Sequence, residues 1–215
     1  MKKHIPNTIT LINLAIGSYG VYYTLMDDYT DAIYFVIAAG LFDFFDGFVA
    51  RILKVKSEIG KQLDSLADLV SFGLLPTFFM LKWMEGRTEF FLIALIIVLF
   101  SALRLAKFNV DDTQSDHFKG LPTPANAIML TSLIFVPFEL YDYTMISICV
   151  LSAVLLVSPT HLLALKFTTF GWQGNQARWV LIGGSILMMA LFQWAFVPVL
   201  IPFYIVVSIV SMLIK

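Results

Sequence analysis

The sequence predicts an all-α protein: a polytopic bundle of about eight transmembrane helices, formed by a single domain over residues 1–215. Composition is the first observation, because 59% of the residues are hydrophobic and only 13% are charged, against roughly 25% charged residues in a soluble domain. The mean hydropathy of +0.85 is the second. The third is that apolar stretches recur along the chain at the length a helix needs to cross about 30 Å of hydrocarbon.

Eight apolar stretches, separated by polar breaks, give the expected helices in order. They cover residues 9–26, 31–52, 61–82, 89–106, 122–140, 145–165, 178–193 and 195–214. Only Gln193 and Trp194 separate the last two stretches, and Pro198 and Pro202 could kink the final one or make it re-enter the membrane. The sequence therefore leaves the number of spans after residue 178 open.

The distribution of basic residues predicts the orientation of the chain. With an even number of spans, twelve of the fourteen Lys and Arg residues fall on one side of the membrane, namely Lys2, Lys3, Arg51, Lys54, Lys56, Lys61, Arg104, Lys107, Lys119, Lys166, Arg178 and Lys215. Loops rich in Lys and Arg stay in the cytoplasm. We therefore expect both termini in the cytoplasm and the chain in the cytoplasmic (inner) membrane, with the lipid bilayer around it and no nucleic-acid partner.

Four carboxylates stand out in the stretch DFFDGFVARILKVKSEIGKQLDSLAD, which begins at residue 43. Asp43 and Asp46 lie on the second expected helix, and Asp64 and Asp68 lie on the third. A carboxylate at the centre of a membrane helix costs roughly 2.5 to 3.5 kcal/mol on insertion scales, so four together indicate a shared function. Because the connection between the two helices is short, the helices are antiparallel neighbours. Their carboxylates are expected to converge near the cytoplasmic ends.

Small residues share the faces that carry these carboxylates. At 100° per residue, an arc of about 100° on the second helix contains Asp43, Asp46, Gly47 and Ala50. A similar stripe on the third helix contains Gly60, Asp64 and Asp68. Anions this close repel one another unless some are protonated or cations lie between them. Mg²⁺ or Mn²⁺ with substrate phosphate oxygens would satisfy such a site, whereas hydrogen bonding between helices is the plainer alternative.

This stretch resembles the signature of the CDP-alcohol phosphotransferase family, Asp-x-x-Asp-Gly-x-x-Ala-Arg, eight residues, Gly-x-x-x-Asp-x-x-x-Asp. All eight fixed positions match: Asp43, Asp46, Gly47, Ala50, Arg51, Gly60, Asp64 and Asp68. The resemblance implies a six-helix core, extended here by two helices, and a pair of Mg²⁺ or Mn²⁺ ions bound by the first three aspartates. It also implies that Asp68 either shares the metal shell or acts as the general base.

The same resemblance implies the residues around the nucleotide. They are Gly47, Ala50, Arg51 and Gly60, which would border the cytidine and its phosphates. On the first helix, Asn7 and Thr10 are candidates for reaching the nucleotide, although helix capping and bonding between helices are comparable explanations.

Further stretches resemble the phosphatidylserine synthase branch of that family. They are PNTITLINLAIG near the start, and RLAKFNV and FKGLPTPA between residues 104 and 125. This resemblance implies transfer of a phosphatidyl group from CDP-diacylglycerol to L-serine with release of CMP, carried out by a homodimer. It does not distinguish acyl lipids from isoprenoid ether lipids.

The candidate residues for binding the acceptor alcohol lie in the 104–121 segment. Serine carries a carboxylate and an ammonium, so its site needs a fixed cation and hydrogen-bond acceptors. Arg104 is the first choice, because a guanidinium binds a carboxylate through two parallel hydrogen bonds, and Asn109 and Lys119 are the further candidates. Glycerol 3-phosphate or an inositol phosphate would call for a more basic pocket.

A cation transporter or proton-coupled carrier is the alternative from another functional class, because intramembrane aspartates are typical of carriers too. Carriers often have two related halves with sites near the midplane of the membrane. Here the carboxylates gather near one edge and the second half of the chain has no counterpart. The sequence therefore favours the transferase.

Overall fold

The computed structural model describes residues 4–26, 28–55, 57–110, 118–163, 171–172 and 174–213. In this part of the chain the α-helices are α1 (His4–Met26), α2 (Ala32–Leu53), α3 (Glu58–Asp68), α4 (Leu75–Met84), α5 (Leu95–Val110), α6 (Thr123–Thr131), α7 (Asp142–Val157), α8 (Gln176–Phe192) and α9 (Val197–Leu213). Short 3₁₀ turns are η1 (Tyr29–Asp31), η3 (Phe91–Ala94), η4 (Ser132–Phe135) and η5 (Gln193–Phe196), and η2 (Leu69–Leu74) is a π-helix. Two antiparallel strands of two residues, β1 (Phe118–Lys119) and β2 (His161–Leu162), complete the fold.

Five helical segments are long and apolar enough to cross a membrane. They are His4–Met26, Tyr29–Leu53, Glu58–Met84, Phe91–Val110 and Gln176–Leu213. The fold is therefore helical, as predicted, and suits an integral membrane protein. Each of the eight expected stretches contains a helix, but the helices Thr123–Phe135 and Asp142–Val157 are shorter than expected. They end before Pro137 and Pro159, because proline cannot continue a helix without losing a hydrogen bond.

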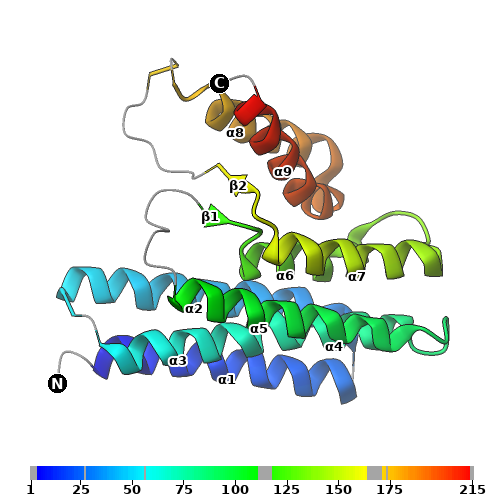
Figure 1. The fold of residues 1–215 in the computed structure, drawn as a ribbon. Coiled ribbons are helices and arrows are strands. Elements are labelled where there is room, and N and C mark those ends of the chain that lie inside the picture. Colours follow the sequence, from blue (N-terminus) through cyan, green and yellow to red (C-terminus); the bar gives the residue numbers. More distant parts are fainter. Residues whose placement is uncertain are drawn as a thin grey trace.

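The last long segment is two helices. Gln193 has a positive φ of 49°, which ends α8, and α9 turns back to pack against α8. Figure 1 shows this hairpin inclined to the bundle of α1 to α5, with α6 and α7 between them. At the close contact within the hairpin, the missing side chain of Gly184 leaves room for the ring of Phe203.

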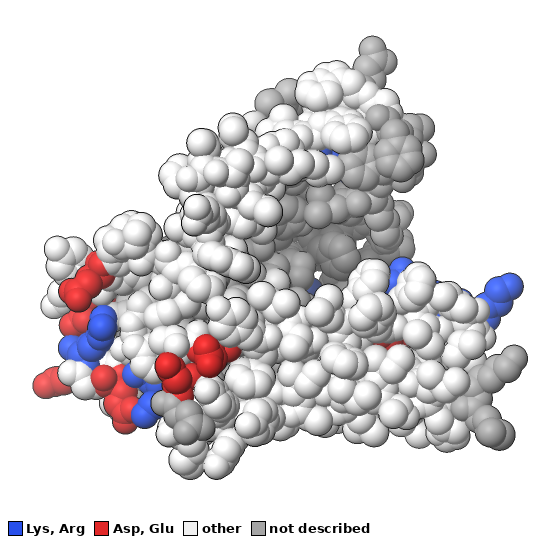
Figure 2. All heavy atoms as spheres, turned by 180° about the vertical axis from the view of Figure 1, so that it is seen from behind, with Lys and Arg blue, Asp and Glu red and all other residues white. Residues whose placement is uncertain are grey.

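The two ends of the bundle differ in composition. The apolar core includes fully buried side chains of η2 and α4, namely Phe72, Phe79, Met80 and Met84. These residues lie in the half of the bundle away from the connection between α2 and α3. Figure 2 shows charged side chains gathered at the ends of the bundle, with an uncharged surface between them. Such a band is typical of a surface that faces lipid.

The α1–α2 connection is at the end opposite the α2–α3 connection. There the Asp28 carboxylate accepts hydrogen bonds from the Thr30 hydroxyl (2.6 Å) and backbone N–H (2.8 Å). These bonds hold the pKa of the Asp28 carboxyl below its usual value. The short connection lets α1 and α2 pack against each other.

The connection between α2 and α3 is tight, as the sequence predicted. Lys54 adopts the left-handed conformation that ends α2, with φ 52° and ψ 39°. The side chain of Ser57 then accepts a hydrogen bond from the backbone N–H of Gly60 and begins α3. The two helices therefore run antiparallel, and the aspartates of one lie beside those of the other.

A π-helix follows directly after Asp68. Within η2, the hydroxyl of Ser71 donates to Oδ1 of Asn13 at 2.8 Å, which ties this segment to α1. Gly17 on α1 makes the approach possible, because a Cβ there would overlap Ser71. Short π-helical turns within helices are frequently found at functional sites.

Candidate active site at the ends of α2 and α3

Three of the four predicted metal ligands meet in the structure. Asp43, Asp64 and Asp68 each offer a carboxylate oxygen, and these oxygens all lie within 4.8 Å of one another. Oδ1 of Asp68 is buried and has no hydrogen-bond partner among the described residues. A set of carboxylate oxygens with an unpartnered buried member fits a hard divalent cation such as Mg²⁺ or Mn²⁺.

Asp46 lies beside this group in a different environment. Its side chain is buried, and its Oδ2 accepts a hydrogen bond of 2.6 Å from the hydroxyl of Thr10 on α1. The group of carboxylate oxygens that lie within 4.8 Å of one another does not include Asp46. Its role as a metal ligand stays a prediction, and the Thr10 contact shows that α1 contributes to the site.

A pocket of about 620 Å³ opens between α1, α2 and α3. Its lining consists of Pro6, Asn7, Thr10, Asp46, Gly47, Ala50, Val55, Ser57, Glu58, Gly60, Lys61 and Asp64. Five of the six residues predicted to bind the nucleotide are in this lining: Asn7, Thr10, Gly47, Ala50 and Gly60. The pocket therefore joins these residues to two of the aspartates.

Several residues of the lining were not singled out from the sequence. Val55, Ser57 and Glu58 lie in the connection and at the start of α3, and Lys61 follows them one turn on. Between Arg51 and Gly60 the signature fixes only the number of residues, not their identity. These residues line the pocket because Lys54 and Ser57 make a tight turn between α2 and α3. The sequence signal for this is the short distance between Arg51 and Gly60 along the chain.

The two glycines of the signature have different surroundings. A Cβ on Gly60 would lie 2.9 Å from Oγ of Ser57 and 3.0 Å from Oδ1 of Asn7, so this glycine lets α1 approach α3. A Cβ on Gly47 would meet only Nη2 of Arg51, at 3.9 Å. Its missing side chain therefore leaves space in the pocket.

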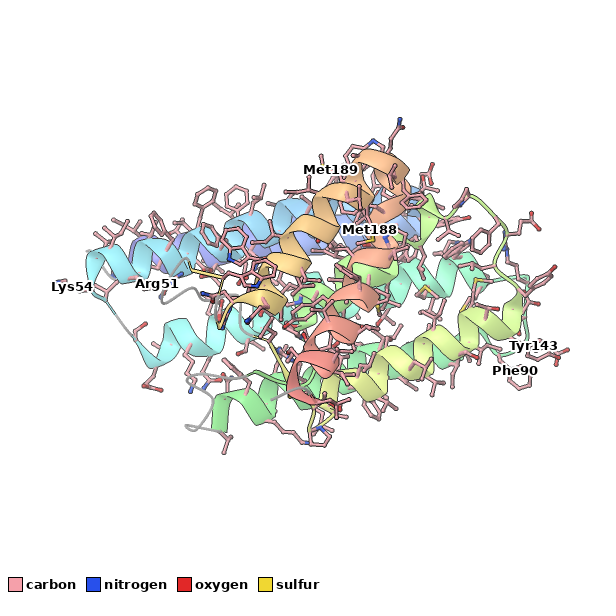
Figure 3. All side chains as sticks on the ribbon, turned by 90° about the horizontal axis from the view of Figure 1, so that it is seen from above. Arg51, Lys54, Phe90, Tyr143, Met188 and Met189 are labelled. Atoms are coloured by element: carbon pink, nitrogen blue, oxygen red, sulfur yellow. The ribbon has the colours of Figure 1, made fainter. Side chains whose placement is uncertain are left out.

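Arg51 is the predicted nucleotide residue that is not in the lining. It is exposed, and its Nε donates to the carbonyl oxygen of Gly47 at 3.0 Å. Figure 3 shows Arg51 and Lys54 near one end of the bundle, with Phe90 and Tyr143 at the other. Arg51 thus lies next to a pocket residue, and its contact with a nucleotide stays a prediction.

On the acceptor side, the structure brings Arg104 of α5 close to the aspartates. Nη1 of Arg104 donates to the Thr123 hydroxyl at 3.3 Å, and its guanidinium lies 5.9 Å from the ring centre of Phe108. Arg104 interacts electrostatically with Asp68. Its Nε is buried without a hydrogen-bond partner among the described residues. A free N–H donor beside a carboxylate group is suited to a small anionic group of a substrate.

The other two residues predicted to bind the acceptor substrate are Asn109 and Lys119. Asn109 donates from Nδ2 to Oγ of Ser65 at 2.9 Å, and its carbonyl oxygen accepts from Nζ of Lys61 at 2.8 Å. These bonds tie the end of α5 to α3. The side chain of Lys119 lies outside the described part of the structure.

The segment before α6 is held by backbone hydrogen bonds to the end of α7 and the residues that follow it. Gly120 has a φ of +76°, and its N–H donates to the carbonyl oxygen of Thr160 at 3.0 Å. A Cβ on Gly120 would lie 2.5 Å from the carbonyl oxygen of Leu156. The glycine of FKGLPTPA therefore sets where α6 begins and brings Thr123 to Arg104.

Comparison with known proteins gives consistent results. Residues 3–159 match the family model described as CDP-alcohol phosphatidyltransferase. A CDP-diacylglycerol–serine O-phosphatidyltransferase of Helicobacter pylori is 35% identical over 130 residues, which are 58% of this chain and 54% of the relative. The protein of that name from Bacillus subtilis is 34% identical over 135 residues, 62% of this chain and 76% of the relative.

An archaeal relative extends the comparison. The protein of the same name from Methanocaldococcus jannaschii is 35% identical over 126 residues, which are 59% of this chain and 58% of the relative. The chain therefore spans about half the length of the Helicobacter pylori relative and more of the other two. Helices α8 and α9 lie beyond the residues that the family model matches.

Proposed function

Because the chain belongs to the CDP-alcohol phosphatidyltransferase family, with residues 3–159 matching its family model, we propose that it transfers the phosphatidyl group of CDP-diacylglycerol to L-serine. The products are phosphatidylserine and CMP. The observation that carries this proposal is the meeting of Asp43, Asp64 and Asp68 next to a pocket that Asp64 lines together with the small residues of the signature. The names of the relatives support the choice of serine as acceptor.

The donor would bind on the α1 side of the site. The pocket at Gly47, Ala50 and Gly60 takes the cytidine and its two phosphates, and Asn7 supplies an amide for hydrogen bonding. Two divalent ions, Mg²⁺ or Mn²⁺, held by the aspartates would neutralise the diphosphate and stabilise the leaving CMP. The tie between Thr10 and Asp46 keeps α1 in register with that group.

The acceptor would bind on the α5 side, next to Asp68. Arg104 binds the serine carboxylate, which fixes the amino acid with its hydroxyl toward the aspartates. The serine oxygen bonds to the phosphorus that carries the diacylglycerol, and the bond from this phosphorus to the CMP oxygen breaks. Asp68 takes the hydroxyl proton as general base, and its Oδ1, which has no hydrogen-bond partner among the residues that the structure describes, would accept it.

The membrane arrangement that we propose has eight spans, with both termini and the active site on the cytoplasmic side of the inner membrane. The bias of Lys and Arg toward the α2–α3 end supports this orientation. The break at Gln193 supports two spans in the segment Gln176–Leu213. A homodimer rests on the family resemblance alone.

The experiment measures CMP release by the purified full chain. CDP-diacylglycerol is supplied with Mg²⁺ or Mn²⁺ and with L-serine, glycerol 3-phosphate or inositol phosphate as acceptor. We expect release only with L-serine, loss of activity in EDTA, and a large loss in Asp43→Asn. The matched control is Asp142→Asn, which removes a carboxylate at the start of α7, away from the aspartate group. A higher rate with glycerol 3-phosphate would refute serine as the acceptor, and full activity in EDTA would refute the metal site.

A further inference from the structure

Buried polar atoms without partners concentrate on one side of the aspartate group. Among the described residues, seven buried side-chain nitrogen and oxygen atoms have no hydrogen-bond partner, and five of them belong to Asp68, Ser101, Arg104 and Asn126. In native proteins most buried polar atoms are hydrogen-bonded to protein or water. A concentration of unpartnered atoms in one region therefore suggests that something else binds there.

Asn126 is the unusual member of this set. It is fully buried on α6, and neither its amide nitrogen nor its amide oxygen has a hydrogen-bond partner within the described ranges of the chain. Asn126 lies one turn beyond Thr123 and about 60° around the helix, so both face the same interior. The Thr123 hydroxyl accepts the hydrogen bond from Arg104. The Asn126 amide is thus carried one helical turn from the residue that binds the guanidinium of Arg104.

The α5 helix also carries buried polar side-chain atoms, on Ser101 and Arg104. Ser101 lies one turn before Arg104, and its buried hydroxyl has no hydrogen-bond partner in the part of the chain that the structure describes. Ser101 is also next to Gly73 of η2, because a Cβ on that glycine would lie 3.1 Å from Cβ of Ser101. The π-helix after Asp68, α5 and α6 therefore meet around a small polar region that the nucleotide pocket does not include.

The chemistry of these groups defines what would bind. Nε of Arg104 and the amide nitrogen of Asn126 are donors, whereas the amide oxygen of Asn126 and Oδ1 of Asp68 are acceptors. A phosphate would satisfy only the donors, and a simple alcohol carries no negative charge to pair with the guanidinium. A small molecule with both a carboxylate and an ammonium satisfies both kinds of group.

We propose that Asn126 determines acceptor specificity by binding the ammonium of an α-amino acid through its amide oxygen, while Arg104 binds the carboxylate. This inference rests on the proposed function, and it adds a residue on α6 to the acceptor site. An acceptor without an ammonium would leave the buried amide oxygen unpaired. Sites of this kind reject such analogues strongly, because a desolvated polar group without a partner is costly.

The test uses Asn126→Leu in the full-length protein. Leucine has nearly the size of asparagine and no polar atom, so it removes the amide without opening a large cavity. We expect the KM for L-serine to rise at least tenfold, the KM for CDP-diacylglycerol to stay within twofold, and the thermal unfolding midpoint to be kept or raised. Asn126→Ala gives a second variant with the same expected change in KM if the leucine disturbs the packing.

A matched control lies on the same helix. Thr131→Val also exchanges a fully buried polar side chain for an apolar one, but the Thr131 hydroxyl already donates to the carbonyl oxygen of Ala127. The KM for L-serine should be unchanged in this variant. A general effect of making α6 more apolar would change both proteins alike.

Binding without turnover separates this inference from the proposed function. L-Alanine keeps the carboxylate and ammonium but has no hydroxyl to react, whereas propanoate lacks the ammonium as well. L-Serine and L-alanine should raise the unfolding midpoint of the wild type in the absence of CDP-diacylglycerol, and this shift should disappear in Asn126→Leu. Propanoate should cause a smaller shift that the substitution does not change.

The outcomes are distinct. CMP release that does not depend on L-serine would refute the proposed function, whereas loss of the L-serine shift in Asn126→Leu would still support the amino-acid site. If L-serine shifts the wild type and Asn126→Leu equally, or if the KM for L-serine stays within twofold, the amide holds a buried water only and the inference is wrong. The inference would also be wrong if neither L-serine nor L-alanine raised the unfolding midpoint of the wild type.

Discussion

Replacing Gly47 with alanine is a sharp test of the nucleotide pocket. Gly47 lies in the last turns of α2 and lines the pocket beside Asp46. An added Cβ would meet only Nη2 of Arg51 at 3.9 Å, which is an ordinary contact distance. The new methyl group would therefore disturb no protein atom and would occupy space that we assign to the donor.

Two effects of opposite sign are expected from this one substitution. Alanine stabilises a helix interior relative to glycine by about 0.5 to 1 kcal/mol, so the free energy of unfolding should rise. Forcing a methyl group into a filled site typically costs about 1 to 3 kcal/mol. The KM for CDP-diacylglycerol should accordingly rise by roughly 5- to 150-fold, because about 1.4 kcal/mol corresponds to a factor of ten.

The assay compares unfolding and kinetics with those of a matched variant. Gly40→Ala makes the same change two turns earlier on α2, where the added Cβ would lie 3.9 Å from the ring of Phe72 and outside the pocket. Both variants should be at least as stable as the wild type in thermal unfolding. Only Gly47→Ala should raise the KM for CDP-diacylglycerol and weaken inhibition by CMP.

One result would refute this reasoning. If Gly47→Ala gains stability and keeps its KM for CDP-diacylglycerol and its inhibition by CMP within twofold, the nucleotide does not lie against this face of α2. The pocket between α1, α2 and α3 would then not be the donor site, even if the aspartates remained essential.

Two further predictions concern the chemistry and the topology. Asp68→Asn keeps the size of the side chain but removes the proton acceptor, so kcat should fall by roughly 10² to 10⁴ with the KM for CDP-diacylglycerol retained; a kcat within threefold of the wild type would show that another group is the base. A cysteine replacing Lys54 should react with an impermeant reagent only from the cytoplasmic side, and one replacing Glu85 only from the opposite side. Cys149 is fully buried and should not react. The reverse labelling pattern would overturn the orientation.

Much of the site could be predicted because it depends on spacing along regular helices. The angular positions of Asp43, Asp64 and Asp68, with a short connection between α2 and α3, require that these carboxylates converge, and they do. The helical class followed from composition in the same way. Helix ends were less predictable: α6 and η4 stop at Phe135 and α7 stops at Val157, short of the expected ends.

Departures from regular α-helical geometry, and contacts between distant parts of the chain, could not be predicted from the sequence. The π-helix after Asp68 changes the angle between successive residues around the helix axis, and there Ser71 donates a hydrogen bond to Asn13 of α1. Asp46 finds a partner in Thr10, a contact across 36 positions that no local pattern encodes. Asn126 was missed because a single polar residue in an apolar helix has no periodic signal, and only its burial without partners distinguishes it.

The arrangement of these contacts suggests why the site needs more of the chain than the signature. α3 carries both Asp64, which lines the nucleotide pocket, and Asp68, which we assign to the acceptor side. The donor side is then completed by α1, through Asn7 and its close approach to Gly60, and the acceptor side by α5 and α6. A helix that belongs to both sides cannot shift toward one substrate without moving away from the other. Its position is fixed at both ends, by the hydrogen bond from Ser71 of the following η2 to α1 and by the bond from Lys61 to the end of α5. Substitutions that weaken either bond should therefore impair the reaction more than the binding of either substrate.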